Sequence, residues 1–520
     1  MHIEKTVVDG VSIIARIDEG KNRIGCMECL RIRLKKYLEF YGLIKPNLIP
    51  IEVIEKELDY FPYQCQAAIT NIPGDHVVAI LPIRDCPVCG TMKHPYRGIS
   101  NYLNSYSKFP DSRGVRKKYR SVQPDEFIRT LQPFFGILGI ATLPVEQKSW
   151  INGVYFYNCM QFLDAIGGYD VAGGKGNTQL FSIASCLGEA MERYFLTGVC
   201  NGADVDAPYD EVSDISVNPV EEWGFPAIDD NEAITEYSPS NAIGWCQADC
   251  LTESDEKKVL VPSDMIYSPP RSEGDVSNIS FGSTNGAASG ATCDDASTQS
   301  LMELIERDSY WYYMRSTSRP YRIGEDQLSD RILSVMHANE KNHYVFELMP
   351  NPFRVAVVQV LAIDEETGIQ SRGTGAMFTL NEAIDRAFNE CNQMLTSLRT
   401  GINVSDDGLD MRWIWFQGEA TRVFPNIFKP MACDTIFKYI DDVSIENPLE
   451  DLLQRFRKQK LDVYRKTLVT ADAFCVTKCI AAEIATTDAT YYSHSDRLHS
   501  FADLLGTEFV PAEYSGTLFM

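Results

Sequence analysis

The stretches 189–193 (Glu-Ala-Met-Glu-Arg) and 303–307 (Glu-Leu-Ile-Glu-Arg) repeat one pattern inside apolar segments that favour helix. On a helix, positions i, i+3 and i+4 share a face, so each segment presents two carboxylates and a guanidinium together. Four carboxylates carried by two helices repel one another unless a cation lies between them. Magnesium bridging nucleotide phosphates suits this role, because it prefers carboxylate and phosphate oxygens. The repeated pattern therefore predicts a metal and nucleotide site.

The composition is that of a soluble globular protein. Its 520 residues suit two or more domains, and the hydrophobic fraction is 44% with a mean hydropathy of −0.18. The longest apolar run, 134–145, is too short to span a bilayer, and the chain begins without a basic stretch followed by an apolar one. A net charge of −24 argues against nucleic-acid or anionic-membrane binding. We therefore expect a cytoplasmic protein with no membrane or nucleic-acid partner.

The chain divides into two sections, 1–124 and 125–520. The first holds two Cys-x-x-Cys pairs and ends in a basic stretch at 113–120 that suits a linker. The second has a mixed α/β pattern, with strands expected at 154–159 and 355–362. Three helices, each entered through a glycine turn, are predicted at 179–196, 293–314 and 380–398. We expect an α/β (mixed α+β) fold, with paired carboxylate helices over mixed sheets and a small zinc-binding α+β domain before them.

The two cysteine pairs, Cys26/Cys29 and Cys86/Cys89, predict a structural zinc site. A gap of two residues lets both thiolates of a pair reach one tetrahedral ion, and four protein ligands leave no open position for catalysis. Buried thiols without a metal are the alternative, and redox activity is a weaker one. The fifteen cysteines are an odd number without the spacing of a small secreted domain, so we expect no disulfide framework.

The predicted second and third helices carry further polar stripes. The stripe of the second comprises Thr292, Asp295, Gln299, Glu303, Glu306 and Tyr310, and that of the third Glu382, Arg386, Glu390 and Gln393. A solvated face with i, i+4 ion pairs explains any one such helix, but two Glu-x-x-Glu-Arg copies favour a site. The glycine-rich stretch 173–177 fails the Walker pattern, although Lys175 can neutralise phosphate there.

The paired motifs resemble the YcaO family when taken with Lys175 between two glycines, Ser185, and the turn at 285–290. The resemblance covers roughly 125–520. The preceding section resembles the zinc-bearing docking region of the D-protein type, found with YcaO proteins that modify ribosomally made peptides of the bacteriocin kind. The resemblance implies a YcaO fold and an ATP-dependent cyclodehydratase that turns Cys, Ser or Thr of a precursor peptide into thiazolines or oxazolines. Such an enzyme needs positioning and charge neutralisation but no nucleophile of its own.

The resemblance also implies which residues hold the cofactors. Magnesium would lie on Glu189, Glu192, Glu303 and Glu306. These four would bind ATP together with Lys175, Ser185, Arg193, Asp295, Arg307 and Gln393. The catalytic base stays unassigned. The implied partners are the precursor peptide, a leader-binding protein like ubiquitin-activating enzyme, and a flavin dehydrogenase, in a homo-oligomer or hetero-complex.

Three positions depart from the family pattern. Ala291 stands where many members carry Asn, and Asp295 where a longer Glu is common. The tail at 514–520 lacks the proline-rich ending of many azoline-forming members, and Pro511 is the only proline nearby. Backbone thioamidation or amidine formation is therefore an alternative reaction. A non-enzymatic zinc scaffold, whose carboxylate helices merely pack in the core, is the third hypothesis.

Overall fold

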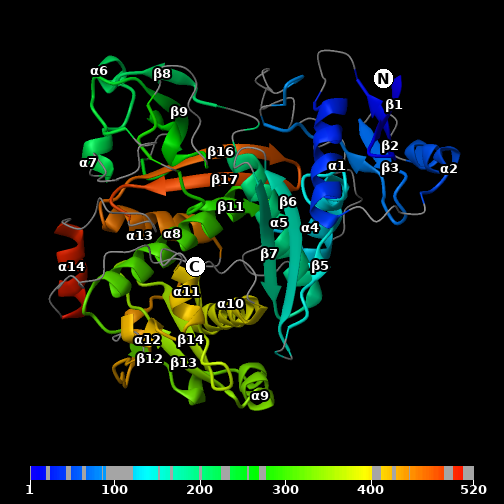
Figure 1. Cartoon of the computed structure of the whole chain (residues 1–520). Helices are drawn as coiled ribbons and strands as arrows, with labels where there is room; N and C mark the ends of the chain where they lie inside the picture. Colours follow the sequence, from blue (N-terminus) through cyan, green and yellow to red (C-terminus); the bar gives the residue numbers. More distant parts are fainter. Residues whose placement is uncertain are drawn as a thin grey trace.

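The structure is a computed structural model, shown in Figure 1. It describes residues 2–18, 24–42, 48–60, 66–84, 86–89, 121–149, 151, 153–163, 168–197, 199, 202–223, 235–253, 257–268, 277–280, 282–400, 411–423, 429–443, 446–484 and 496–506. The basic stretch at 113–120, Pro511 and the tail at 514–520 lie outside these residues.

The N-terminal section is a four-stranded antiparallel sheet in the order β1-β2-β3-β4. Its elements are β1 (His2–Val8), β2 (Val11–Ile17), α1 (Met27–Tyr41), α2 (Ile51–Glu55), β3 (Ala67–Thr70) and β4 (Val78–Ala79). Helix α1 packs on β2 through Leu30, Leu34 and Leu38, which join Ile13 in a small core. Every residue of β2 is buried, because both of its faces are covered.

Three further sheets form the rest of the chain. The first is β5 (Val145–Glu146), β6 (Tyr155–Leu163) and β7 (Gly168–Gly176). The second contains β8 (Val205–Ala207), β9 (Ile243–Cys250), β10 (Lys258–Pro262), β11 (Ala287–Gly290), β16 (Val463–Ala471) and β17 (Phe474–Ala481). The third is β12 (Tyr321–Arg322), β13 (Asn342–Leu348), β14 (Ala356–Asp364) and β15 (Gln370–Met377). The strand pairs are antiparallel.

Three long helices each follow a strand of a different sheet and pack back onto it. They are α5 (Gln179–Leu196) after β7, α8 (Cys293–Arg315) after β11, and α10 (Leu380–Thr400) after β15. Figure 1 shows α8 below the β16–β17 layer and α10 beneath β7. Thr178 and Thr292 cap the first turns of α5 and α8 with their side-chain oxygens. The mixed α+β fold and all three predicted helices are confirmed.

The glycine turn predicted before α8 is confirmed at Gly286, which lies in a turn with a φ of +77°. The glycine turns predicted before α5 and α10 are wrong, because the glycines that the structure describes there lie in β7 and β15. The reason is close strand–helix packing. A Cβ on Gly174 would overlap the backbone of Ser182 and Cys186 in α5, and one on Gly373 would overlap Ala387 and Cys391 in α10. Glycine is needed there because backbone meets backbone.

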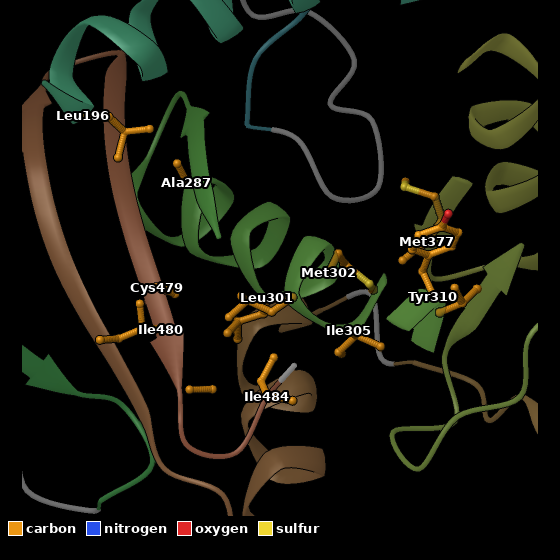
Figure 2. Close-up of a cluster of buried hydrophobic side chains, with 14 of the residues drawn as sticks. Leu196, Ala287, Leu301, Met302, Ile305, Tyr310, Met377, Cys479, Ile480 and Ile484 are labelled. Atoms are coloured by element: carbon orange, nitrogen blue, oxygen red, sulfur yellow. The ribbon is translucent and has the colours of Figure 1, made fainter. Parts of the chain in front are cut away.

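The main core lies between these layers and includes the apolar side of α8. Figure 2 shows Leu301 and Ile305 of α8 among Ile480 of β17, Ile484 and Met377. Leu301, Ile305 and Ile484 are all at most 1% exposed. With this side fixed in the core, the opposite side of α8 is held toward the polar groups described below.

The remaining helices lie around the main core. They are α4 (Pro124–Leu131), α6 (Tyr209–Val212), α7 (Pro219–Trp223), α9 (Asp330–Ala338), α11 (Met411–Phe416), α12 (Ala420–Val423), α13 (Pro448–Lys458) and α14 (Asp496–Leu505). The N-terminal section contacts this body through Arg33, which donates to the carbonyl of Leu138 at 3.3 Å and, within its own section, to that of Leu81 at 2.8 Å. None of the described helices combines the length and apolar character that crossing a membrane requires.

Candidate nucleotide and metal sites

The first Glu-x-x-Glu-Arg segment lies in the last two turns of α5. Arg193 is i+4 from Glu189 and pairs with it at 2.5 Å, and its other nitrogen reaches Asp170 of β7 at the same distance. Glu192 accepts the backbone N–H of Ser289 in β11 at 2.7 Å. The α5 motif is therefore fixed to two strands from different sheets.

The second segment lies in the middle of α8, and its two carboxylates have different surroundings. Arg307 donates to Glu303 at 3.1 Å, and Glu303 also accepts the backbone N–H of Gly286 at 3.2 Å. Glu306 is 2% exposed and accepts from Arg307, from the Thr374 hydroxyl at 2.7 Å, and from the N–H of Ala376 at 2.9 Å. Glu306 thus joins α8 to β15.

Helix α10 completes the group. Its Glu390 pairs with Lys175 of β7 at 2.5 Å. Arg386, one turn earlier, donates to Gln299 of α8 at 3.3 Å. The third polar stripe therefore faces the other two motifs, and α10 closes the side between β7 and α8.

The ionisation of these groups shows how closely their charges approach. Burial, together with the charges of Glu189 and Glu303, raises the pKa of Glu192 to about 8. Burial also raises the pKa of Glu189 and of Glu303, although Arg193 and Arg307 oppose it. Glu192 accepts from Ser289 of β11, and Glu303 accepts from Gly286 just before the same strand, so the α5 and α8 motifs meet at β11. Their carboxylates carry charge that a divalent cation would stabilise.

Burial alone would raise the pKa of Glu390, but the charges of Lys175 and Arg307 outweigh it and lower that pKa. Carboxylates and cations from α5, α8, α10 and β7 thus alternate around one centre. Such an arrangement suits a magnesium ion bound to a polyphosphate, since carboxylates hold the ion and the cations hold the phosphates.

The other predicted residues lie on α5, α8 and α10 or beside β11, with varied contacts. Ser185 is exposed on α5, one turn before Glu189. Asp295 lies in the first turn of α8 and accepts the N–H of Ser121 at 3.1 Å. Gln393 of α10 lies beside Gly173, where a Cβ would come within 2.8 Å of its amide nitrogen. Ala291, next to β11, is buried and offers no hydrogen-bonding side chain.

Three contributors to the centre were missed in the sequence. Asp170 binds Arg193, the Asn285 side chain accepts from Arg307 at 3.3 Å, and Lys478 of β17 lies beside Glu303. Asn285 belongs to the turn that was singled out, so its position carried a signal. Asp170 and Lys478 are single charged residues within strands and carried none.

The four predicted zinc ligands come together at the start of α1. The sulfurs of Cys26 and Cys29 are 3.7 Å apart, Cys26 is 3.6 Å from Cys86, and Cys29 is 3.3 Å from Cys89. All four are buried, and their sulfurs lie within 4.8 Å of one another. A tetrahedral zinc with bonds of about 2.3 Å needs sulfurs about 3.8 Å apart, so the set fits a metal ion.

A family model described as YcaO cyclodehydratase, ATP- and Mg²⁺-binding, matches residues 173–484. This range is more than half of the chain and contains every residue of the carboxylate motifs. The chain belongs to the YcaO cyclodehydratase family. Membership makes it an enzyme of an ATP- and magnesium-dependent family, which contradicts the hypothesis of a non-enzymatic scaffold.

Solved structures share the YcaO fold at low sequence identity. A heterocyclase in complex with substrate and cofactor has a TM-score of 0.73 and 18% identity, covering 98% of this chain and 77% of its own. The YcaO protein of Methanopyrus kandleri bound with AMPPCP and Mg²⁺ has a TM-score of 0.51 and 20% identity, covering 70% and 92%. The E. coli microcin synthetase McbBCD complex with pro-MccB17 bound has a TM-score of 0.51 and 14% identity, covering 71% and 96%.

Proposed function

We propose that this YcaO protein is an ATP-dependent peptide cyclodehydratase. It would convert Cys, Ser or Thr residues of a ribosomally made precursor peptide into thiazolines or oxazolines. The observation that carries the proposal is that β11 and the turn before it hold a carboxylate of each Glu-x-x-Glu-Arg segment, since the N–H of Ser289 donates to Glu192 of α5 and that of Gly286 to Glu303 of α8. The heterocyclase neighbour supports it, because the similarity to that fold extends over 98% of this chain.

We assign the carboxylates of the site to magnesium and its cationic side chains to phosphate. Glu189, Glu192 and Glu303 are the best placed to hold magnesium, since each is partly accessible and has a raised pKa. Glu306 is the least available of the four, because three hydrogen bonds occupy its oxygens. Lys175, Arg193 and Arg307 lie beside these carboxylates and would neutralise phosphate oxygens.

ATP would supply the phosphoryl group that makes the amide oxygen a leaving group. The substrate thiol or hydroxyl attacks the carbonyl carbon of the preceding amide, and the side chain loses its proton. The amide nitrogen then loses its proton, and the former amide oxygen leaves as phosphate as the C=N bond of the azoline forms. ATP and peptide thus give ADP, phosphate and a peptide lighter by one water. The chain needs to orient the peptide and neutralise charge.

The N-terminal section is proposed to hold one zinc ion on Cys26, Cys29, Cys86 and Cys89 as a docking domain. The spacing of the sulfurs supports this assignment. The microcin synthetase neighbour was solved as a multi-protein complex with its pro-peptide bound. By analogy, we propose that this chain acts with a leader-binding partner.

The deciding experiment co-expresses the chain with a precursor peptide and its partner protein, then measures ADP release and peptide mass. We expect loss of one water mass for each modified residue, with ADP formed in proportion. Glu189→Ala and Glu303→Ala should abolish both, and Glu253→Ala is the control, since Glu253 pairs with Lys257 at the surface. If both motif variants keep full activity, the nucleotide-site assignment is wrong.

The same mass measurement separates the alternative reaction. Replacement of an oxygen by a sulfur in the peptide, with sulfide required, would show backbone thioamidation instead. The presence of Ala291 favours keeping thioamidation as a second candidate, because its methyl group offers no polar contact beside β11.

A further inference from the structure

Lys478 is a buried cation in the middle of β17 with an unusual set of partners. It is 1% exposed, and its ammonium donates to the backbone carbonyls of Asn285, at 2.5 Å, and of Ser283. Burial lowers its pKa to about 8, and the charge of Glu303 acts in the opposite direction. Burying a lysine side chain costs free energy on folding, so a lysine at this position suggests that it has a role at the turn.

The turn that Lys478 holds contacts two residues of the α8 motif. The backbone N–H of Gly286 donates to Glu303 at 3.2 Å, and the side chain of Asn285 accepts from Arg307 at 3.3 Å. On its other side, the Gly286 carbonyl accepts from the Ser300 hydroxyl and, at 2.8 Å, from the N–H of Cys479. The turn thus connects β17 to Glu303 and Arg307, the proposed ligands of metal and phosphate.

Substitution at the turn itself is restricted. Gly286 has a φ of +77°, and a Cβ there would overlap the carbonyl of Cys479. The positive φ of Gly286 therefore sets the conformation in which the Gly286 N–H reaches Glu303. The Lys478 ammonium donates to the backbone carbonyls of Ser283 and Asn285, and these two bonds keep the turn in that conformation.

We propose that Lys478 is a positioning residue of the nucleotide site, which holds the turn at 283–286 so that Gly286 and Asn285 orient Glu303 and Arg307. The inference rests on the proposed function for its link to nucleotide, but the hold on the turn is a property of the chain alone. Without the ammonium, two buried carbonyls lose their donor, and Glu303 and Arg307 lose fixed partners.

The test compares Lys478→Met with a matched control, Lys466→Met. Methionine keeps most of the side-chain volume and removes the donor. Lys466 is the register partner of Lys478 on β16, is 9% exposed, and pairs with Asp204 at 2.9 Å. Both variants therefore remove a buried lysine from the same strand pair, but only one of them touches the turn.

Two measurements are made on each full-length variant. Amide hydrogen exchange of the peptide covering 283–290 is followed without nucleotide, and binding of magnesium with a nonhydrolysable ATP analogue is followed by calorimetry. We expect K478M to exchange faster in this peptide and to bind the analogue about tenfold more weakly, the loss typical of a charged hydrogen bond. The KM for ATP should rise by a similar factor. K466M should match wild type in all three.

Faster exchange and weaker binding in both variants alike would show general destabilisation and overturn the proposal. Unchanged exchange in K478M also overturns it, because the turn would then not depend on the ammonium. Faster exchange with unchanged affinity refutes the link to nucleotide. A wild-type chain that binds no magnesium nucleotide would refute the proposed function, while the exchange comparison would still decide whether Lys478 holds the turn.

Discussion

At the scale of single residues, the two carboxylates of the α8 motif differ in what their oxygens already contact. Glu306 is 2% exposed and accepts from three protein donors, so it joins α8 to β15 as well as carrying charge. The Glu303 side chain is 20% exposed and accepts from Arg307 and Gly286. The same motif therefore contains one carboxylate tied to the core and one facing the site.

This difference in contacts predicts that substitution of Glu306 mainly lowers stability, whereas substitution of Glu303 mainly lowers activity. Glu306→Ala should lower stability by about 3 kcal/mol, because it removes one of the carboxylate partners of the Arg307 charge and leaves the Ala376 N–H without the acceptor it has in Glu306. Glu303→Ala should cost much less stability but remove most activity. Thermal unfolding of the nucleotide-free proteins checks this, with the activity assay run in parallel. Equal losses of thermal stability in the two variants would contradict the assignment.

Glu192 provides a pH-dependent test in metal-free protein. Its pKa rises from the usual 4.5 to about 8 through burial, so the folded state prefers the protonated form. A raised carboxyl pKa stabilises the fold fully below pH 4.5, and this stability is lost as the pH rises toward 8. The loss is about 1–2 kcal/mol after allowance for partial exposure of the side chain.

Glu192→Gln removes the titration, so we expect its melting temperature, relative to wild type, to be higher at pH 9 than at pH 5. The comparison is made by calorimetry with EDTA present. Addition of magnesium and an ATP analogue at pH 9 should then stabilise wild type more than the variant. A difference between variant and wild type that is independent of pH would show that Glu192 is already ionised at pH 5.

At the scale of elements, the site depends on how closely three helices pack on the strands before them. Glu390 of α10 reaches Lys175 of β7 only because α10 lies backbone to backbone on β15 at Gly373. Gly373→Ala should push α10 away from β15, at a cost of about 1–3 kcal/mol typical of overpacking. The ion pair with Lys175 should weaken as a result.

The matched control is Gly324→Ala, where an added Cβ would contact only the side chain of Asp326. We expect the melting temperature and the affinity for a magnesium nucleotide to fall in Gly373→Ala and to stay near wild type in the control. If the affinity is unchanged while stability falls, the position of α10 does not matter to the site.

The same elements show how far the sequence alone reaches. The polar and apolar pattern predicts α5 and α8 to within a residue at each end, because such periodicity is a local signal. Thr178 and Thr292, which cap the two helices in the structure, are a further local signal. The glycines before α5 and α10 resemble turn signals in the sequence, because their packing partners Ser182 and Ala387 lie in helices that the sequence pattern does not place against a strand. Close packing is a tertiary property.

The candidate site likewise has a part that the sequence predicts and a part that depends on tertiary contacts. The Glu-x-x-Glu-Arg repeat predicts which side chains share a helix face, and in the structure both copies contact β11 or the turn before it. Their fixation depends on contacts from distant strands, such as Asp170 with Arg193 and Thr374 with Glu306. A single polar residue in a strand has no neighbours in sequence that reveal such a partner. Lys478 was missed for this reason.

At the scale of the whole molecule, the N-terminal section and the body meet through buried polar contacts. Arg33 of α1 is 3% exposed and donates to the carbonyl of Leu138, and the Tyr194 hydroxyl of α5 donates to the carbonyl of Pro82 at 2.7 Å. The cysteine cluster lies at the start of the same helix α1. Loss of a metal ion bound there should therefore loosen α1 first, before any effect reaches α5.

We predict that purified protein contains one zinc per chain by elemental analysis, and that Cys86→Ser removes it. Three remaining thiolates cannot complete a tetrahedral shell, so repulsion and lost coordination should release the N-terminus of α1. Cys246→Ser is the control, since Cys246 is equally buried but lies in β9 outside the cluster. It should keep its zinc.

Hydrogen exchange then shows how far the loss extends. In Cys86→Ser, peptides within 24–42 and 66–84 should exchange faster, while those within 293–315 should keep wild-type protection. Affinity for magnesium nucleotide should stay within about twofold of wild type, because the described contacts of the carboxylate motifs come from 121 onward. Precursor-peptide processing with the partner protein should fall much more, since docking would be lost. A parallel loss of nucleotide affinity would instead make the N-terminal section part of the catalytic site, and the separation of docking from catalysis would be wrong.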